Sequence, residues 1–131
     1  MAPRAHEAEV GFTLVEVLVV IIIIGVLLAI AVPAFLGFKD RGKMATAEAN
    51  LRAALPAAEA FYSDHLTYVG MDDPATGMRS IDQGMAATVT VNDPADLTTT
   101  HYCLKSVYDN QTFWDYGPGG TITSSKPAGC T

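Results

Sequence analysis

A single acidic residue, Glu16, stands at the front edge of a long uncharged stretch, and it is the first candidate for chemistry in this sequence. No charged residue occurs from Val17 to Phe38. A carboxylate in a membrane-spanning helix costs about 2.5–3.5 kcal/mol at the bilayer centre and less near an end, so such residues are functional candidates by default. The two interpretations at this point are a carboxylate that binds a cationic partner and an acid that simply reaches the membrane surface.

The residues that enzymes commonly use form no recognisable pattern. Histidine occurs only at positions 6, 65 and 101. Ser63, Asp64 and His65 are adjacent in the sequence, whereas the members of a catalytic triad are recognised by how they meet in space. The glycine-rich segment 117–120 lacks the Lys-Ser/Thr pair and the following helix of a phosphate-binding loop. We therefore predict that the chain is not an enzyme.

The element that positions Glu16 is a helix long enough to cross a bilayer. At about 1.5 Å per residue, the uncharged run would span roughly 33 Å, against a hydrocarbon core of roughly 30 Å. Gly25 and Pro33 interrupt the run, and such residues are tolerated in lipid where neighbouring helices satisfy the freed backbone groups. We expect Pro33 to bend the helix or loosen its preceding turn.

A cleavable secretory signal is the alternative interpretation of this run. Ala29-Ile30-Ala31 has the small-x-small spacing of a signal-peptidase site, and cleavage would then follow Ala31. An ordinary signal core is about 7–15 residues long and follows a basic segment. The run here is longer, and residues 1–10 hold one arginine and two glutamates. An uncleaved membrane anchor is therefore the stronger alternative.

A second helical pattern continues directly from the first. Apolar residues recur at steps of three and four, which indicates one helical stripe. Glu48 and Arg52 are spaced to form an ion pair on the same helix. Because no turn cluster separates the two patterns, we predict one helix from near Phe12 to about Asp64. The stripe consists of Met44, Ala47, Leu51, Ala54, Leu55, Ala58, Phe61 and Tyr62.

The remainder of the chain favours a small sheet. Segments 87–91 and 101–108 alternate as strands do, and 121–125 is a weaker third candidate. Turns are expected at "NDPAD", "DNQ" and "GPGG". On the middle strand, Tyr102, Leu104 and Tyr108 would face the helix. The predicted fold class is α+β, with a long amino-terminal helix packed on a small antiparallel sheet.

Composition bears on the possible partners of the chain, and the cysteines bear on its covalent cross-links. The chain has 131 residues, with 14 acidic and 8 basic side chains, and no basic patch that would favour nucleic acid. Outside the cytoplasm, the pair Cys103 and Cys130 would favour a disulfide that contributes about 3 kcal/mol. Two buried free thiols and a metal pair are the alternatives. Cys103 would point away from the helix, on the outer face of the sheet.

The segment "GFTLVEVLVV", followed by an uncharged helix with Gly25 and Pro33, resembles the amino-terminal signature of type IV pilins and of the related type II secretion pseudopilins. The resemblance covers residues 11–38, and the rest agrees in architecture only. It implies cleavage by prepilin peptidase between Gly11 and Phe12, and then methylation of the new amine of Phe12. The implied divisions are a leader at 1–11, an assembly helix at 12–38 and a globular head at 39–131.

The same resemblance implies where the chain is located and how it assembles. The precursor would span the inner membrane once, and mature chains would be assembled by membrane machinery into an extracellular filament used in adhesion or motility. Glu16 would be the assembly carboxylate, with Gly25 and Pro33 in the packed helix. Cleavage supplies the cation that Glu16 lacks, because the amine of Phe12 would have a pKa near 7.7–8.0 and be largely charged at neutral pH.

Several alternatives stay open beside this interpretation. A minor pilin, a pseudopilin and a single-copy membrane-anchored protein share these features. Major pseudopilins tend to hold the late loop with calcium, and "NDPAD" offers Asn92, Asp93 and Asp96 as oxygen donors; their spacing is not that of an EF-hand, so we predict a capped turn and no cofactor. The basic residues of segment 39–43 would, by the positive-inside rule, place the head in the cytoplasm; the motif and the cysteine pair favour the outside.

Overall fold

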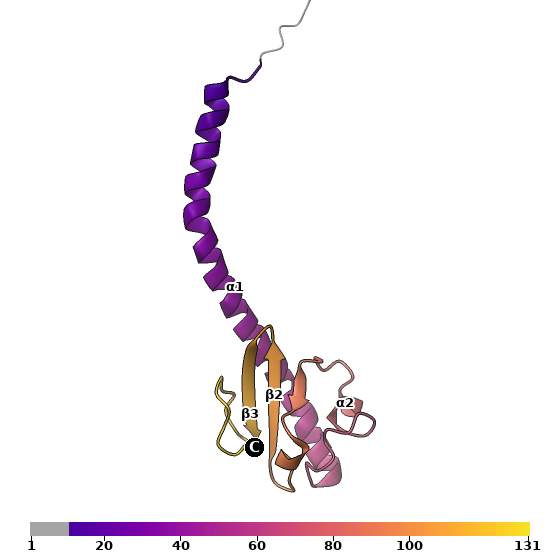
Figure 1. Ribbon diagram of the computed structural model, residues 1–131. Coiled ribbons are helices and arrows are strands. Elements are labelled where there is room, and N and C mark those ends of the chain that lie inside the picture. Colours follow the sequence, from indigo (N-terminus) through magenta and orange to yellow (C-terminus); the bar gives the residue numbers. More distant parts are fainter. Residues whose placement is uncertain (1–10) are drawn as a thin grey trace, which may run out of the picture. The chain divides into compact units, whose positions relative to one another are not determined.

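The computed structural model describes residues 11–131 and has the predicted α+β fold (Figure 1). Its contacts separate two units, one ending at Phe38 and the other beginning at Lys39. In chain order, the elements are helix α1 (Leu14–His65), helix α2 (Met78–Ile81), strand β1 (Val89–Val91), the 3-10 turn η1 (Pro94–Asp96), strand β2 (Tyr102–Tyr108) and strand β3 (Gln111–Gly117).

Helix α1 begins one residue after Thr13, which caps it. The backbone N–H of Glu16 donates to Thr13 Oγ1 at 3.2 Å, as an N-cap residue requires. The helix then continues without a break through Gly25 and Pro33 to His65. The predicted limits, Phe12 and Asp64, are therefore confirmed to within two residues. Among residues 11–131, α1 is the one helix that is long and apolar enough to cross a membrane, judged by length and composition.

The sheet is antiparallel, with the strand order β1-β2-β3. Strand β2 is the segment expected at 101–108, and β1 is a shortened form of the segment expected at 87–91. Asp109 and Asn110 connect β2 to β3 with φ values of 46° and 67°. Positive φ at both central residues is the geometry of a two-residue hairpin, and Asp and Asn tolerate it. This confirms the turn expected at "DNQ".

The prediction of a third strand at 121–125 is wrong. In that segment only Thr123 pairs, in an isolated bridge with Trp114. The third strand is β3, which follows the hairpin directly and pairs with β2 along its whole length, from Tyr108↔Gln111 to Tyr102↔Gly117. The hairpin decides the outcome, because a two-residue turn places the next residues opposite β2, whereas segment 121–125 begins beyond the "GPGG" turn.

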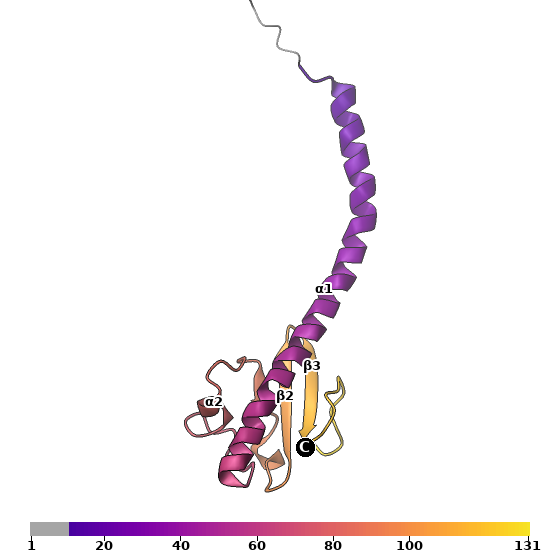
Figure 2. The ribbon, with the colours of Figure 1, turned by 180° about the vertical axis from the view of Figure 1, so that it is seen from behind.

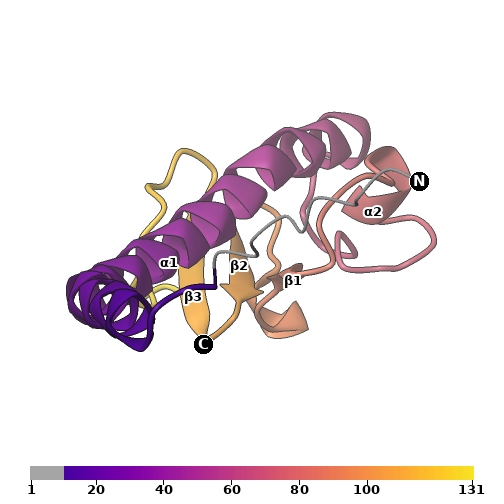
Figure 3. The same cartoon turned by 90° about the horizontal axis from the view of Figure 1, so that it is seen from above.

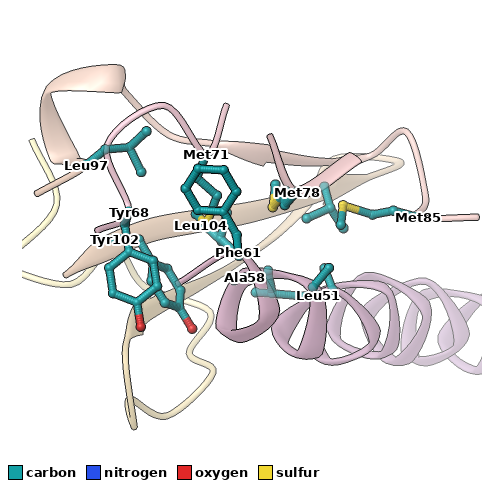
Figure 4. Packing of buried hydrophobic residues seen from close by; sticks show 13 residues of the cluster. Leu51, Ala58, Phe61, Tyr68, Met71, Met78, Met85, Leu97, Tyr102 and Leu104 are labelled. Carbon is teal, nitrogen blue, oxygen red and sulfur yellow. The ribbon is translucent and has the colours of Figure 1, made fainter. Parts of the chain in front are cut away.

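The core lies between the sheet and the second half of α1, which crosses one face of β2 and β3 (Figure 2). Most of the expected helical stripe is buried here, but Met44 is exposed. Tyr102 and Leu104 face the helix as predicted, whereas Tyr108 is 40 % exposed, because β2 extends past the core at this end. Figure 4 shows the packing of Leu51, Ala58, Phe61, Tyr68, Met71, Met78, Met85, Leu97, Tyr102 and Leu104.

Two irregular segments flank the sheet on opposite sides (Figures 1 and 3). The segment around α2 lies beyond the β1 edge, and the loop after β3 lies beyond the other edge. Arg79 of α2 fastens the first of these segments, because its guanidinium donates hydrogen bonds to the carbonyls of Met85, Ala86 and Val89. These bonds satisfy carbonyls that a loop would otherwise leave unpaired.

A disulfide joins Cys103 of β2 to Cys130 in the final loop, with 5.8 Å between the Cα atoms. Cys103 lies on the face of β2 away from the helix, since its neighbours Tyr102 and Leu104 face inward. Asp96 holds the same end of the chain, because Thr131 donates its backbone N–H to Asp96 Oδ1 at 2.7 Å. The final loop is therefore bound to both β2 and η1.

Replacing both Cys103 and Cys130 with serine is expected to lower the free energy of unfolding by about 2–4 kcal/mol, because the unfolded chain regains the entropy of the closed loop. The measurement is urea denaturation of the full chain in detergent, followed by Trp114 fluorescence. The control is the wild-type chain with its disulfide reduced, which should unfold at the same urea concentration as the double variant. Equal midpoints for the oxidised wild type and the double variant would contradict the prediction.

Candidate functional site

Glu16 lies in the first turn of α1 and faces a shallow, mainly apolar groove. The groove is lined by Phe12, Glu16, Val17 and Val20. Thr13 and Glu16 have the spacing of a capping box, but only the first half of that motif is formed, from the Glu16 N–H to Thr13. Among residues 11–131, no side chain forms an ion pair or hydrogen bond with the Glu16 carboxylate. The carboxylate is therefore available to a partner from another molecule.

The helix around Glu16 has no protein cover in the described chain. Every large apolar side chain from Phe12 to Phe38 is at least 44 % exposed, although the segment consists mainly of such residues. An exposed apolar surface of this length is not stable in water, because each fully exposed Val, Leu or Ile side chain forgoes about 1.5–3 kcal/mol of burial. Lipid or other protein chains must therefore cover it.

The other predicted residues of this region are distributed along the same exposed surface. Gly11 and Phe12 precede α1, and Phe12 is 84 % exposed. Gly25 and Pro33 lie within the helix, and a Cβ atom added at Gly25 would meet nothing within 4 Å. Gly25 thus leaves space against the helix that a closely packed neighbour could fill. Of the predicted leader, residues 1–10 lie outside the described residues.

The oxygen donors of "NDPAD" serve the fold. Asp93 caps η1 by accepting the N–H of Ala95 at 2.8 Å, which confirms the predicted capped turn. Asn92 donates to Asp96 Oδ2 at 2.7 Å. Burial raises the pKa of Asp96, but hydrogen bonds from Thr131 and Asn92 outweigh burial and hold the pKa below its usual value. Within residues 11–131, no group of three His, Cys, Asp or Glu side chains is placed to hold a metal ion.

Ser63, Asp64 and His65 do not form a catalytic arrangement. The Ser63 hydroxyl donates to the backbone carbonyl of Glu59 at 3.0 Å. His65 Nδ1 lies 3.0 Å from the carbonyl oxygen of Phe61, and the two rings are stacked with centroids 4.2 Å apart. Both side chains therefore bond to the last turns of α1 rather than to each other.

A cluster of two tyrosines and two carboxylates was not anticipated from the sequence. The hydroxyl of Tyr68 donates to Glu59 Oε2 at 3.2 Å, and that of Tyr102 to Glu59 Oε1 at 3.4 Å. The two rings meet edge to face, 4.7 Å between centroids, and their hydroxyls project together in Figure 4. Asp115 of β3 is only 1 % exposed, and its Oδ1 has no hydrogen-bond partner. Only the fold brings these side chains together.

Burial raises the pKa of each of the three enclosed members of this cluster. The pKa of Tyr68 rises to about 12, with Glu59 as the second cause. The pKa of Tyr102 also rises, through burial and then through the charge of Asp115. For Asp115, burial raises the pKa and outweighs the opposing effect of the Tyr102 hydroxyl. A neutral Asp115 is therefore favoured in the folded chain relative to the unfolded chain.

The Asp115→Asn variant is expected to lose a pH dependence that the wild type has. A carboxyl whose folded pKa lies above its unfolded value of 3.8 stabilises fully below that value, and the contribution is lost as the pH rises through the folded pKa. Thermal unfolding of the full chain in detergent is measured between pH 4 and pH 8. The unfolding temperature of the variant should rise relative to that of the wild type as the pH rises. The control is exposed Asp72→Asn, and parallel curves for all three chains would contradict the prediction.

Comparison with known proteins finds similarity to pilus subunits and to type II secretion proteins. The family model for the prokaryotic N-terminal methylation motif matches residues 11–32. Type IV major pilin protein PilA of Myxococcus xanthus is 45 % identical over 65 residues, which are 50 % of this chain and 30 % of that protein. Type II secretion system core protein G of Pseudomonas aeruginosa is 34 % identical over 63 residues, 48 % of this chain and 44 % of that protein.

A third relative extends the similarity along the chain. Type IV wide pilus major component PilA4 of Thermus thermophilus is 25 % identical over 130 residues, covering 92 % of this chain and 95 % of that protein. The chain spans less than half the length of the two relatives above. No solved structure matches it with comparable significance. Its amino-terminal motif, its long apolar helix and these relatives make the chain similar to type IV pilins and type II secretion pseudopilins.

Proposed function

We propose that this chain is a structural subunit of a type IV pilus filament, without catalytic activity of its own. Prepilin peptidase cleaves between Gly11 and Phe12, and the new amine of Phe12 is methylated. The precursor is held in the inner membrane by the first half of α1, with the head on the outer side. Assembly machinery then moves mature chains into a filament in which these helices pack against one another.

Cleavage supplies the partner of Glu16. Before cleavage, the nitrogen of Phe12 is a neutral amide; after cleavage it is an amine with a reference pKa near 7.7–8.0, and methylation leaves its charge in place. The amine of one subunit neutralises the carboxylate of a neighbour. Because a charge pair away from water is favourable only when both members meet closely, this contact selects one axial register between helices.

The observation that carries the proposal is the uncovered apolar half of α1, residues 14–38, in which the only acid, Glu16, has no partner within residues 11–131. A bilayer covers the apolar side chains but holds no cation at a fixed position beside Glu16. A bundle of identical processed helices covers the side chains and supplies one amine for each carboxylate. Contacts of this kind join different surfaces of neighbouring copies, and such contacts build a fibre when the rotation does not close.

The test is the intact mass and amino-terminal sequence of protein sheared from the surface of cells that make it. The expected chain begins at N-methylated Phe12 and is two hydrogens lighter than its reduced form, because of the Cys103–Cys130 disulfide. A chain found only in membranes and beginning at Met1 or Ala2 would indicate a single-copy anchor. A chain beginning after Ala31 would indicate a secreted domain.

A type II secretion pseudopilin is the second candidate, because a protein G of that system is among the relatives. A pseudopilin would share the cleavage and the methylated Phe12, so the processed terminus does not distinguish the two. Shearing does: a pilus subunit is recovered in long surface filaments, whereas a pseudopilin at natural expression remains with the cell envelope.

A further inference from the structure

The turn between β2 and β3 is bound to α1, near the point where the second unit begins. Lys43 Nζ lies 2.6 Å from Asp109 Oδ2 and 3.6 Å from Asp40 Oδ1. The ion pair is partly sheltered, because the Lys43 side chain is 21 % exposed. The hairpin turn lies beside α1 in both side views (Figures 1 and 2). The turn is therefore held at the level of Lys43 on the helix.

This level lies close to the end of the apolar run. Lys43 follows Phe38 by five residues, or about 7.5 Å along a helix. The headgroup layers of a bilayer add roughly 5–7 Å on each side of its hydrocarbon core. In a precursor whose apolar run spans the bilayer, which rests on the function proposed above, the spacing along the helix from Phe38 to Lys43 is therefore comparable to the depth of the headgroup layer.

The side chains near Lys43 and the hairpin turn are of types that suit the headgroup layer of a bilayer. Val107 and Tyr108, the last residues of β2, are 43 % and 40 % exposed. Tyrosine is enriched at membrane–water interfaces, because its ring is apolar and its hydroxyl is polar. Lys39 and Arg41 are exposed on the helix, and neither forms a salt bridge within residues 11–131.

The charges at this level favour an anionic surface. Three basic residues, Lys39, Arg41 and Lys43, are accompanied by two acids, Asp40 and Asp109. Both acids lie within salt-bridge distance of Lys43. The hydrogen bond from Lys43 lowers the pKa of Asp109, and the charge of Lys39 adds to this effect. Neither Lys39 nor Arg41, however, forms a salt bridge within residues 11–131. A basic residue near an anionic bilayer contributes about 1 kcal/mol of attraction.

We propose that Val107 and Tyr108, with Lys39 and Arg41, form a second membrane contact that rests on anionic phospholipid headgroups before assembly. This surface is called the juxtamembrane face below. A bilayer is the occupant we infer, because Lys39 and Arg41 directly follow the apolar run that ends at Phe38. The contact orients the head on the membrane and is given up when the chain enters a filament.

The test places a fluorescent reporter on the juxtamembrane face of the full, unprocessed chain. Trp114 is the single tryptophan of the chain, so Trp114→Phe gives a silent background. Tyr108→Trp adds the reporter, and Ile81→Trp on α2 is the matched control, since Ile81 is 42 % exposed. Val20→Trp reports insertion. Each variant is reconstituted in phosphatidylcholine vesicles with or without phosphatidylglycerol, containing lipids brominated near the headgroup or deep in the acyl chains.

Shallow bromines are expected to quench a tryptophan at 108 about twofold more than one at 81, as interfacial burial requires. Adding Lys39→Gln and Arg41→Gln should reduce this difference in the anionic vesicles only. If Trp114→Phe does not fold, Trp114 is kept in the Tyr108→Trp chain and in the Ile81→Trp chain. The difference in quenching between these two chains is then measured instead.

The insertion reporter separates the two ways of failing. Deep quenching at position 20 together with equal shallow quenching at 108 and 81 would overturn the juxtamembrane face and leave the pilin function intact. Absence of deep quenching at position 20 would show that the run does not insert, and the proposed membrane precursor and the juxtamembrane face would both be wrong.

Discussion

Replacing Glu16 with alanine is expected to abolish filaments while the protein remains in the membrane. The variant keeps the apolar run and the cap at Thr13, so insertion and helix formation are unaffected. It leaves the amine of a neighbouring Phe12 without a counter-charge in the helix bundle. Removing one member of a buried ion pair costs about 3–5 kcal/mol, which corresponds to a loss of more than about a hundredfold in association at each contact.

The measurement is the ratio of sheared filament protein to membrane protein, determined by immunoblotting, with electron microscopy of the filaments. Asp40→Ala is the matched control, because Asp40 is the first acid after the uncharged run and should be dispensable for filaments. Glu16→Gln distinguishes charge from hydrogen bonding and should fail as the alanine variant does. Normal filaments from Glu16→Ala would remove the proposed role of Glu16 in setting the register.

The second large effect is expected at Gly117, where alanine should destabilise the head by about 3 kcal/mol or more. Gly117 pairs with Tyr102 across β2 and β3. A Cβ atom at Gly117 would lie 2.5 Å from Cε1 of Tyr102, and closer still to Cζ and Oη. The Tyr102 ring is buried in the core and cannot move aside, because it packs on Tyr68.

Thermal unfolding of the full chain in detergent measures this effect. The control is Gly119→Ala: a Cβ there meets nothing within 4 Å, but φ is +74°, so only the cost of a left-handed alanine applies, about 1–2 kcal/mol. A double variant with Tyr102→Ala should show strong coupling, since removing the ring removes the clash. Equal destabilisation by alanine at 117 and at 119 would contradict the steric explanation.

The sequence predicted well those features that depend on residues close together along the chain. The limits of α1 and its buried stripe follow from a periodicity of three and four residues, and the turn after β2 follows from the Asp-Asn pair. The motif around Glu16 is local in the same sense. Strand β3 was missed because Asp115 and Gly117 are uncommon in strands, and aromatic residues fall on both of its faces, which hides the alternation.

The cluster of Glu59, Tyr68, Tyr102 and Asp115 was missed for a different reason. Its members come from α1, the segment after it, β2 and β3, so no local spacing connects them. Asp115 in particular is of a residue type that is common in turns, although it is buried here. Its position became visible only with the register of β2 and β3, which pairs it with Leu104.

The uninterrupted course of α1 has a mechanical consequence. A pull on the apolar half of a subunit is carried along this one helix to Leu51, Ala58 and Phe61, which are buried against the sheet. No loop lies in this load path. The final loop and the segment around α2 lie outside this path, and their contacts stabilise the head without carrying the pull.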